Sequence, residues 1–410
     1  MRDRSRLVWI IQEGALYVLL LLLPFSNAAI ELSFGFLLVG WLLERLSSGT
    51  TRAGGVWTHS SLNTLVKWLA AYLAVCALSI VVSDYPKSSL RALFAKWMEY
   101  LGFLVIVAHV VWNRPAAIRR GLIVVACSAL LVVIESVAQE LFGHGPFRGF
   151  PLAYYGRMTG PYRDPIDLAT YFMVVIPVLL MFAVTCRRWR RWVLWGLLIM
   201  VFGCLARTES LGAWLGLGIG LAVVVMMDRT VRRHALVLCF GAALVGAVYL
   251  QRIGRLSEVF SGGDIGKVDR WFMWQAAIRM ITDRPILGHG LNTLMANYLR
   301  YWVGGERQPR YAHNCYLQVT AETGLIGLVS FVGLLSCLLA RLMARRRQVP
   351  SQEQRWLLGL SAGLIAFLVQ AGIDTNFYVL RQAALFWTLS GLALGLSERL
   401  AHAPVIVGGR

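Results

Sequence analysis

The chain has 410 residues, of which 58% are hydrophobic and only 15% are charged, and its mean hydropathy is +0.62. A water-soluble domain of this length needs more polar surface than this composition provides. The formal net charge is +19, but the arginines stand in short clusters between apolar runs, as charges that orient a membrane protein do. They are not interleaved with the exposed aromatics of a nucleic-acid-binding fold. The sequence therefore predicts an integral membrane protein with no nucleic-acid partner.

Long apolar runs predict an all-α protein with about twelve transmembrane helices, because each crossing takes roughly 20 apolar residues and the backbone in lipid must satisfy its own hydrogen bonds. In chain order, the predicted spans are 8–24, 30–45, 63–82, 94–112, 120–142, 166–186, 192–206, 211–228, 234–250, 315–340, 356–373 and 381–398. A helical loop, 251–314, separates the ninth span from the tenth. The predicted division is thus 1–250, 251–314 and 315–410.

The basic residues of alternate connections predict the orientation of the chain. The N-terminal segment and the connections near 114–120, 187–191, 229–233 and 341–347 are short and rich in arginine, which places them and both termini in the cytoplasm. The other connections face outward. The longest of these, 251–313, carries nine basic residues, and binding of an anionic group is the leading reason to keep arginine there, since a guanidinium matches phosphate oxygens bidentately.

The segment 266–301 predicts two amphipathic helices with a break at Pro285. These helices could lie in the membrane interface, with their arginines on lipid headgroups. Alternatively, outward-facing arginines from several connections converge on a diphosphate, and ion pairs with nearby carboxylates compete for them. The candidate diphosphate ligands are Arg157, Arg163, Arg207, Arg270 and Arg284.

His313 directly precedes the tenth predicted span, and Asn314, Gln318 and Glu322 continue it as one polar stripe. Polar groups at membrane depth usually face a cavity or each other. An imidazole with a pKa near ~6.5 is suited to accept a proton from a hydroxyl near neutral pH. We therefore expect His313 to be a catalytic base supported by Asn314 and Glu322, with a purely structural histidine as the alternative. No clustered metal-ligand pattern or phosphate-binding glycine loop occurs on the outer side, so we expect no metal and no cofactor.

Four segments resemble motifs of the O-antigen ligase/polymerase superfamily. They are Arg157-x-x-Gly160-x-Tyr162-x-x-Pro165-x-Asp167, Thr208-Glu209-Ser210-Leu211-Gly212-Ala213-Trp214, Arg270-Trp271 through Pro285, Gly288 and Gly290, and His313-Asn314 through Glu322, Gly324 and Gly327. Two positions depart from the superfamily pattern: Asp167 replaces an asparagine, and Leu211 replaces an arginine. The role of that arginine is either lost or taken by Arg207.

The resemblance implies a GT-C-like glycosyltransferase of the bacterial inner membrane with a periplasmic site. Its donor is a glycan on undecaprenyl diphosphate, its acceptor is a sugar hydroxyl of lipid A–core oligosaccharide, and its reaction is a metal-independent, inverting transfer. One dominant outer loop favours an O-antigen ligase over an O-antigen polymerase or a protein O-oligosaccharyltransferase. A bundle of this size is also the outline of a secondary transporter or lipid-linked glycan flippase, but the polar residues gather at the outer rim and not at the midplane.

Overall fold

The computed structural model describes residues 2–47, 56–58, 62–229, 231–234, 236–238, 240–241, 251, 265–304, 308–345 and 351–402. The described chain is helical apart from its turns and two isolated β-bridges in the loop 143–157. The helices are α1 (Arg2–Leu22), α2 (Asn27–Ser47), η1 (Val56–Thr58), α3 (Asn63–Val81), α4 (Pro86–Ala92), η3 (Leu93–Trp97), α5 (Met98–Asn113), α6 (Ala116–Phe142), η4 (Tyr154–Gly156), α7 (Pro165–Thr185), α8 (Trp189–Arg207), α9 (Leu211–Met227), α12 (Ile265–Asp283), α13 (Leu294–Asn297), η5 (Tyr298–Arg300), α14 (Cys315–Arg345), α15 (Ser351–Gln370), η7 (Asn376–Tyr378) and α16 (Leu380–Ala401).

The structure confirms an all-α membrane protein. Each predicted span overlaps a helix, except the ninth, 234–250, most of which lies outside the described residues. Within the described ranges, six helices are long and apolar enough to cross a membrane by length and composition. The total of twelve spans and the side on which the loop 251–314 lies stay predictions.

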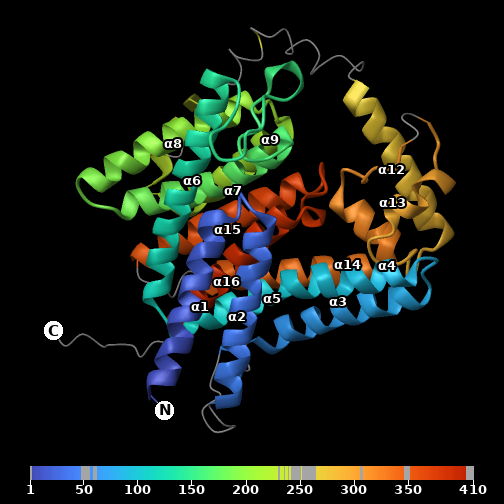
Figure 1. Ribbon diagram of the computed structural model, residues 1–410, viewed down its shortest axis with the longest axis horizontal. Coiled ribbons are helices and arrows are strands. Elements are labelled where there is room, and N and C mark those ends of the chain that lie inside the picture. The colour runs from blue at the N-terminus through green and yellow to red at the C-terminus, as the bar shows by residue number, and fades with distance from the viewer. Residues whose placement is uncertain are drawn as a thin grey trace.

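The centre of the bundle is α7, whose side chains are buried along almost its whole length. Asp164 caps its first turn by accepting a hydrogen bond from Ile166 N at 2.8 Å, and Pro165 occupies the first helical position, where its missing N–H costs nothing. Around α7 pack α15, α9 and α8, while α16 packs against α5 and α14 against α3 (Figure 1).

Glycines let these helices approach closely, as is common between helices in membranes. A Cβ at Gly216 or Gly220 of α9 would lie 2.6–2.7 Å from backbone oxygens of α15, and one at Gly363 of α15 would lie 2.4 Å from the Val174 oxygen of α7. The Gly391 and Gly395 positions of α16 are equally close to α5. The sequence thus specifies these contacts with residues that have no side chain.

The bundle has two distinct ends. The first turn of α7, the start of α14 and the α15–α16 turn meet at one, which we call the His313 end because His313 and Asp374 are hydrogen-bonded there. At the opposite end, Trp356 near the start of α15 donates a hydrogen bond to Thr185 at the end of α7 at 2.9 Å.

The second predicted amphipathic helix is shorter than expected. The segment 291–302 forms only α13 and the 3-10 turn η5. Its beginning is fixed by a tertiary contact, because the Glu322 carboxylate accepts hydrogen bonds from Asn292 N at 2.7 Å and Leu294 N at 3.3 Å.

Candidate functional site

His313 is hydrogen-bonded to Asp374. Its Nδ1 lies 2.9 Å from Asp374 Oδ1, and the side chains are 28% and 16% exposed. A carboxylate only accepts hydrogen bonds, so Nδ1 carries the proton and Nε2 has its lone pair available. Asp374 therefore orients a partly exposed imidazole through Nδ1, and the other ring nitrogen, Nε2, can accept a proton.

The α15–α16 turn holds Asp374 in place. Thr375 N donates to the same Oδ1 at 2.8 Å, and Cys315 N donates to the carbonyls of Ala371 at 2.8 Å and Asp374 at 3.2 Å. The first residue of α14 is therefore tied to this turn. The sequence prediction did not identify Asp374, although a carboxylate in a turn that is predicted to face outward between two apolar spans is a signal that could have found it.

The two predicted supporting residues do not contact the imidazole. The Asn314 side chain caps α14, accepting hydrogen bonds from Tyr316 N and Leu317 N at 3.0 Å each. Glu322 is fully buried and, besides the α13 contacts, accepts hydrogen bonds from Gln318 Nε2 at 3.1 Å and Tyr378 Oη at 2.8 Å. The structure therefore places both residues as supports of the backbone around His313.

The motif that ends α12 docks on the motif that begins α14. Leu325 N donates to the Pro285 carbonyl at 2.8 Å, His289 N to Ala321 at 3.1 Å, and Gly290 N to Glu322 at 2.8 Å. Glycine is required on both sides of this contact. A Cβ on Gly288, whose φ is +67°, would lie 2.5 Å from the Glu322 backbone, and one on Gly324, whose φ is +71°, would lie 1.9 Å from the Ile286 oxygen.

The two motifs around Arg157 and Arg207 are joined in the same way. Met158 N donates to the Arg207 carbonyl at 3.0 Å, and Arg157 Nε donates to the Thr208 carbonyl at 2.8 Å. Buried Gln139 of α6 holds the following loop, since its amide oxygen accepts from Thr159 N and Gly160 N at 3.0 Å each. These contacts bring the α6–α7 loop to the turn between α8 and α9.

The start of α16 connects this loop to the His313–Asp374 pair. Gln382 Nε2 donates to the Asp167 carbonyl at 2.8 Å, and Arg381 Nη1 donates to the Pro161 carbonyl at 3.1 Å. The Asp167 carboxylate is close enough to Asp374 and Arg381 to interact electrostatically with both. Asp167, at the position where the superfamily pattern has asparagine, thus lies beside the partner of His313.

The five predicted diphosphate ligands differ in how far their guanidinium groups are already engaged. Arg207 pairs with Glu140 at 2.6 Å, and Arg284 pairs with Asp84 at 3.0 Å. Arg163 is exposed and lies over the Phe150 ring at 5.6 Å. Arg270 is half-exposed on α12. Within the described ranges, Arg163 and Arg270 form no ion pair with a carboxylate, so their donors are the most available of the five.

The surroundings at the end of α12 shift the pKa values of Asp283, His289 and Tyr301. A hydrogen bond donated by the Tyr301 hydroxyl lowers the pKa of Asp283, while burial, followed by Asp283 itself, raises the pKa of Tyr301 to about 12. Burial lowers the pKa of His289, whose ring nitrogen Nε2 lies 3.1 Å from the Met280 carbonyl. Burial thus disfavours the charged form of this fully buried histidine, which differs in this respect from half-exposed His313.

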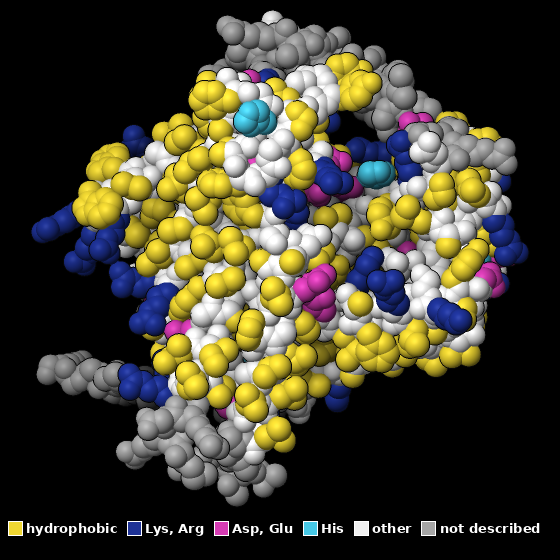
Figure 2. Space-filling view, viewed as in Figure 1, with side chains coloured by type: hydrophobic (Ala, Val, Ile, Leu, Met, Phe, Trp, Pro, Cys, Tyr) yellow, Lys and Arg dark blue, Asp and Glu magenta, His cyan; other side chains and the backbone are white. Residues whose placement is uncertain are grey.

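Charged and histidine side chains gather around a hollow between the α9 and α12 regions, while hydrophobic side chains cover most of the remaining visible face (Figure 2). No group of three or more His, Cys, Asp or Glu side chains that could hold a metal ion occurs in the part of the chain that the structure describes. The fold and this gathering of polar groups define an all-α membrane protein with a polar site at one end of its bundle.

Comparisons with known proteins show which proteins the chain resembles. The family described as O-antigen ligase matches residues 195–332. A Rickettsia conorii protein named "Putative polysaccharide ligase" is 26% identical over 227 residues, covering 52% of each chain. The exopolysaccharide production protein ExoQ of Rhizobium meliloti is 24% identical over 364 residues, covering 82% of this chain and 78% of that protein. The chain is therefore similar over this part to O-antigen ligases, and its relatives are named as polysaccharide ligases.

The chain spans about half the length of the first curated relatives it matches. A solved structure described as "Structural coordination of polymerization and crosslinking by a peptidoglycan synthase complex" aligns with a TM-score of 0.48 at 20% identity, over 82% of this chain and 96% of that chain.

Proposed function

We propose that this protein is a glycosyltransferase that transfers a glycan from undecaprenyl diphosphate to a sugar hydroxyl of lipid A–core oligosaccharide. The observation that carries the proposal is the His313–Asp374 pair at the end of the bundle where the arginine-bearing turns meet. The family match and the relatives named as polysaccharide ligases support this class of reaction.

In the proposed reaction, His313 Nε2 accepts the proton of the acceptor hydroxyl as its oxygen attacks the anomeric carbon of the donor. The bond between that carbon and the diphosphate oxygen breaks, and undecaprenyl diphosphate leaves with the bonding electrons. Asp374 holds the imidazole and stabilises its protonated form. A single displacement inverts the anomeric centre, and the diphosphate leaving group already supplies the activation.

Arginines are proposed to bind the diphosphate and to stabilise the charge that develops on it, an effect worth a few kcal/mol for each well-aimed donor. Arg163 and Arg270 are the leading ligands because neither pairs with a carboxylate within the described ranges. Arg157, whose Nε donates to the Thr208 carbonyl, is a further candidate in the loop that also carries Arg163. Arg207 and Arg284 would first have to exchange their carboxylate partners.

The proposal includes a placement in the cell. The chain spans the bacterial inner membrane with both termini in the cytoplasm, so that the His313 end faces the periplasm, where it meets the outer leaflet and both lipid-linked substrates. The support is the arginine content of the short connections at the opposite end of the bundle.

The test uses purified full-length protein with undecaprenyl-diphosphate-linked glycan and lipid A–core oligosaccharide, without ATP or an ion gradient. We expect transfer, and we expect His313→Ala and Arg270→Ala to reduce it by about 10²-fold or more. Arg279→Ala, on the same helix as Arg270, is the matched control and should leave transfer within about twofold. Undiminished transfer by correctly inserted His313→Ala protein would contradict the proposed base, and a requirement for a gradient would favour a transporter.

A second candidate acceptor is the end sugar of another lipid-linked glycan, which makes the reaction a polymerisation. The match to a protein named for exopolysaccharide production covers more of this chain than the R. conorii match does. This coverage supports polymerisation as a second candidate reaction. Offering the two acceptors separately and in competition decides between them, since a ligase elongates only the lipid A–core arm.

A further inference from the structure

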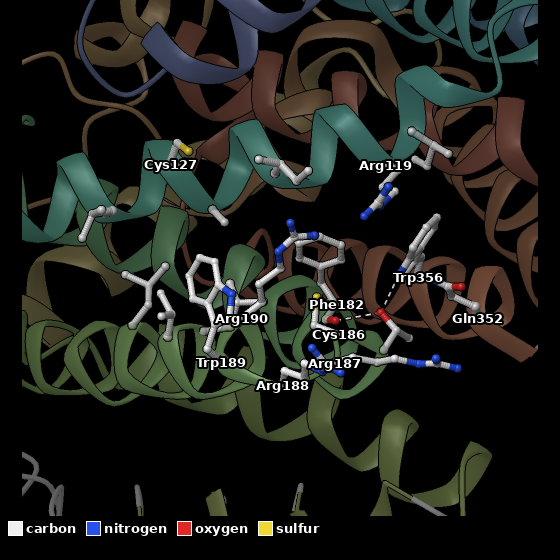
Figure 3. A pocket seen from close by; sticks show the side chains of 18 of the residues that line it. Arg119, Cys127, Phe182, Cys186, Arg187, Arg188, Trp189, Arg190, Gln352 and Trp356 are labelled. Carbon is white, nitrogen blue, oxygen red and sulfur yellow. Dashed lines mark hydrogen bonds between the residues drawn. The ribbon is translucent and has the colours of Figure 1, made fainter.

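A large groove lies at the opposite end of the bundle from His313. It has a volume of about 1560 Å³ and is bounded by α6 and α8, with the ends of α7 and α15 at its base (Figure 3). We call it the α6–α8 groove. Because α7 has 21 residues and begins beside Asp374, the end of the groove at Thr185 is about 30 Å from Asp374 at 1.5 Å per helical residue.

The mouth of the groove is strongly basic. Four arginines line it, Arg119 from α6 and Arg187, Arg188 and Arg190 from the α7–α8 connection and the start of α8, whereas Glu353 is the one acidic lining residue. Figure 3 draws Arg119 and Arg190 reaching toward the same space from opposite walls, and both lie within electrostatic range of Cys186 between them. Figure 2 likewise shows Lys and Arg side chains at the edge where Figure 1 places the α7–α8 connection.

The rest of the groove is apolar and has a defined length. Its α6 wall runs from Arg119 to Leu130, which is about 16 Å at 1.5 Å per residue, and its α8 wall runs over a similar distance to Met200. Several wall side chains are unusually open to the surroundings, such as Val193, which is 57% exposed. About 16 Å is half of the ~30 Å hydrocarbon thickness, so the apolar part of the groove matches the depth of one leaflet.

We propose that the α6–α8 groove binds an anionic glycerophospholipid of the adjoining leaflet, with its phosphate among the four arginines and its acyl chains along α6 and α8. Guanidinium forks match phosphate oxygens, and basic pockets between transmembrane helices hold anionic headgroups in this way. Arginines that served orientation alone would need no groove beneath them, because any position in a short connection suffices. The combination of a basic mouth and apolar walls therefore favours a ligand with an anionic headgroup and apolar chains.

The test measures quenching of Trp189 fluorescence by phospholipids with brominated acyl chains. Trp189 lines the groove and is 66% exposed, and its signal is the difference between the wild-type protein and Trp189→Phe. The full-length protein is placed in phosphatidylcholine vesicles that contain either brominated phosphatidylglycerol or brominated phosphatidylcholine as the minor lipid. We expect stronger quenching by phosphatidylglycerol, and we expect Arg119→Gln/Arg190→Gln to reduce that preference by about tenfold.

Two further variants separate headgroup binding from other effects. Arg229→Gln/Arg233→Gln removes the same charge from the next basic connection, outside the groove, and should keep the preference. Gly196→Phe keeps all four arginines but fills the groove from α8, where a Cβ meets nothing within 4 Å, and should abolish quenching by either lipid.

Three results would overturn the proposal. Equal quenching of the wild-type protein by the two brominated lipids would mean that ordinary bulk lipid fills the groove. An unchanged preference in the Arg119→Gln/Arg190→Gln protein would mean that the arginines do not select the headgroup. Displacement of brominated phosphatidylglycerol by undecaprenyl phosphate at lower concentration than by unlabelled phosphatidylglycerol would assign the groove to a polyprenyl lipid instead.

Discussion

His313 has a backbone φ of +46°, a left-handed conformation that is uncommon for residues other than glycine. Such conformations cost about 1–3 kcal/mol and persist where neighbouring contacts enforce them. Here Gln318 accepts a hydrogen bond from Ala312 N at 3.2 Å on one side, while the Asn314 cap and the Cys315 contacts hold the other. The imidazole is therefore held toward Asp374 by the strained backbone and by the start of α14 together.

Replacing Asp374 by asparagine tests whether its charge serves the reaction. The amide fits the same space but cannot stabilise a protonated imidazole. We expect kcat for glycan transfer to fall by about 10²- to 10⁴-fold with KM nearly unchanged, measured by steady-state kinetics on protein of normal thermal stability. Asp228→Asn, which removes the carboxylate partner of Arg355 at the opposite end of the bundle, is the control with near-normal kcat. A raised KM at constant kcat would mean that Asp374 serves substrate binding.

His289 gives the loop after α12 a pH-dependent stability. Burial lowers its pKa below the ordinary value of 6.5 and outweighs the attraction of Asp283, 3.9 Å away. The unfolded chain then binds a proton more readily than the folded one, so this contribution is present above pH 6.5 and is lost as the pH falls through and below that value. We expect the drop in Tm between about pH 8 and about pH 5 to be smaller in His289→Gln than in the wild-type protein. Equal drops in both proteins would assign the acid sensitivity to other groups.

At the scale of elements, the turn after α12 and the first turns of α14 form one unit. Three backbone hydrogen bonds join them, and Gly288 and Gly324 allow their backbones to touch. Glu322 adds the start of α13 and Tyr378 of η7 to the same unit. Polar residues at the start of α14 thus hold the segment after α12 in place, and with it Arg284 and the helix that carries Arg270.

Gly324→Ala should disrupt this unit. The new Cβ would lie 1.9 Å from the Ile286 oxygen at a φ of +71°, so strain and overpacking together should lower the free energy of unfolding by about 3 kcal/mol. Thermal unfolding in detergent, followed by tryptophan fluorescence, measures the effect. Gly218→Ala in α9, where a Cβ meets nothing within 4 Å, should be neutral or stabilising by up to ~1 kcal/mol. A wild-type Tm for Gly324→Ala would contradict the docking described here.

At the scale of the whole molecule, function depends on which end of the bundle faces which compartment. Single cysteines in a background without the seven native ones can report this. We expect Tyr154→Cys, at a position that is 85% exposed near the His313 end, to react with a membrane-impermeant maleimide in cells whose outer membrane is opened. Trp189→Cys, at a 66% exposed position of the opposite end, should react only after the inner membrane is disrupted. The reverse pattern would contradict the proposed orientation.

Much of the architecture was predictable because the apolar runs are long and the charges between them are few. The spans around α7 and α14 were located to within a few residues, and Gly288 and Gly324 were noted as motif residues. The close backbone contact that those glycines allow was not predictable, because the sequence does not show which segment packs against each glycine. Asp374 was missed for a related reason, since it lies 61 positions after His313 and nothing local links the two.

The sequence alone determined that the chain is a helical membrane protein with its unusual polar residues in alternate connections, because hydrophobic length and charge are local properties that each segment carries by itself. Only the tertiary structure decided that Asp374 partners His313, that Asn314 and Glu322 support the backbone, and that Arg207 and Arg284 already hold carboxylates. These are pairings between helices far apart in the chain, and the packing of α7, α14, α15 and α16 sets them.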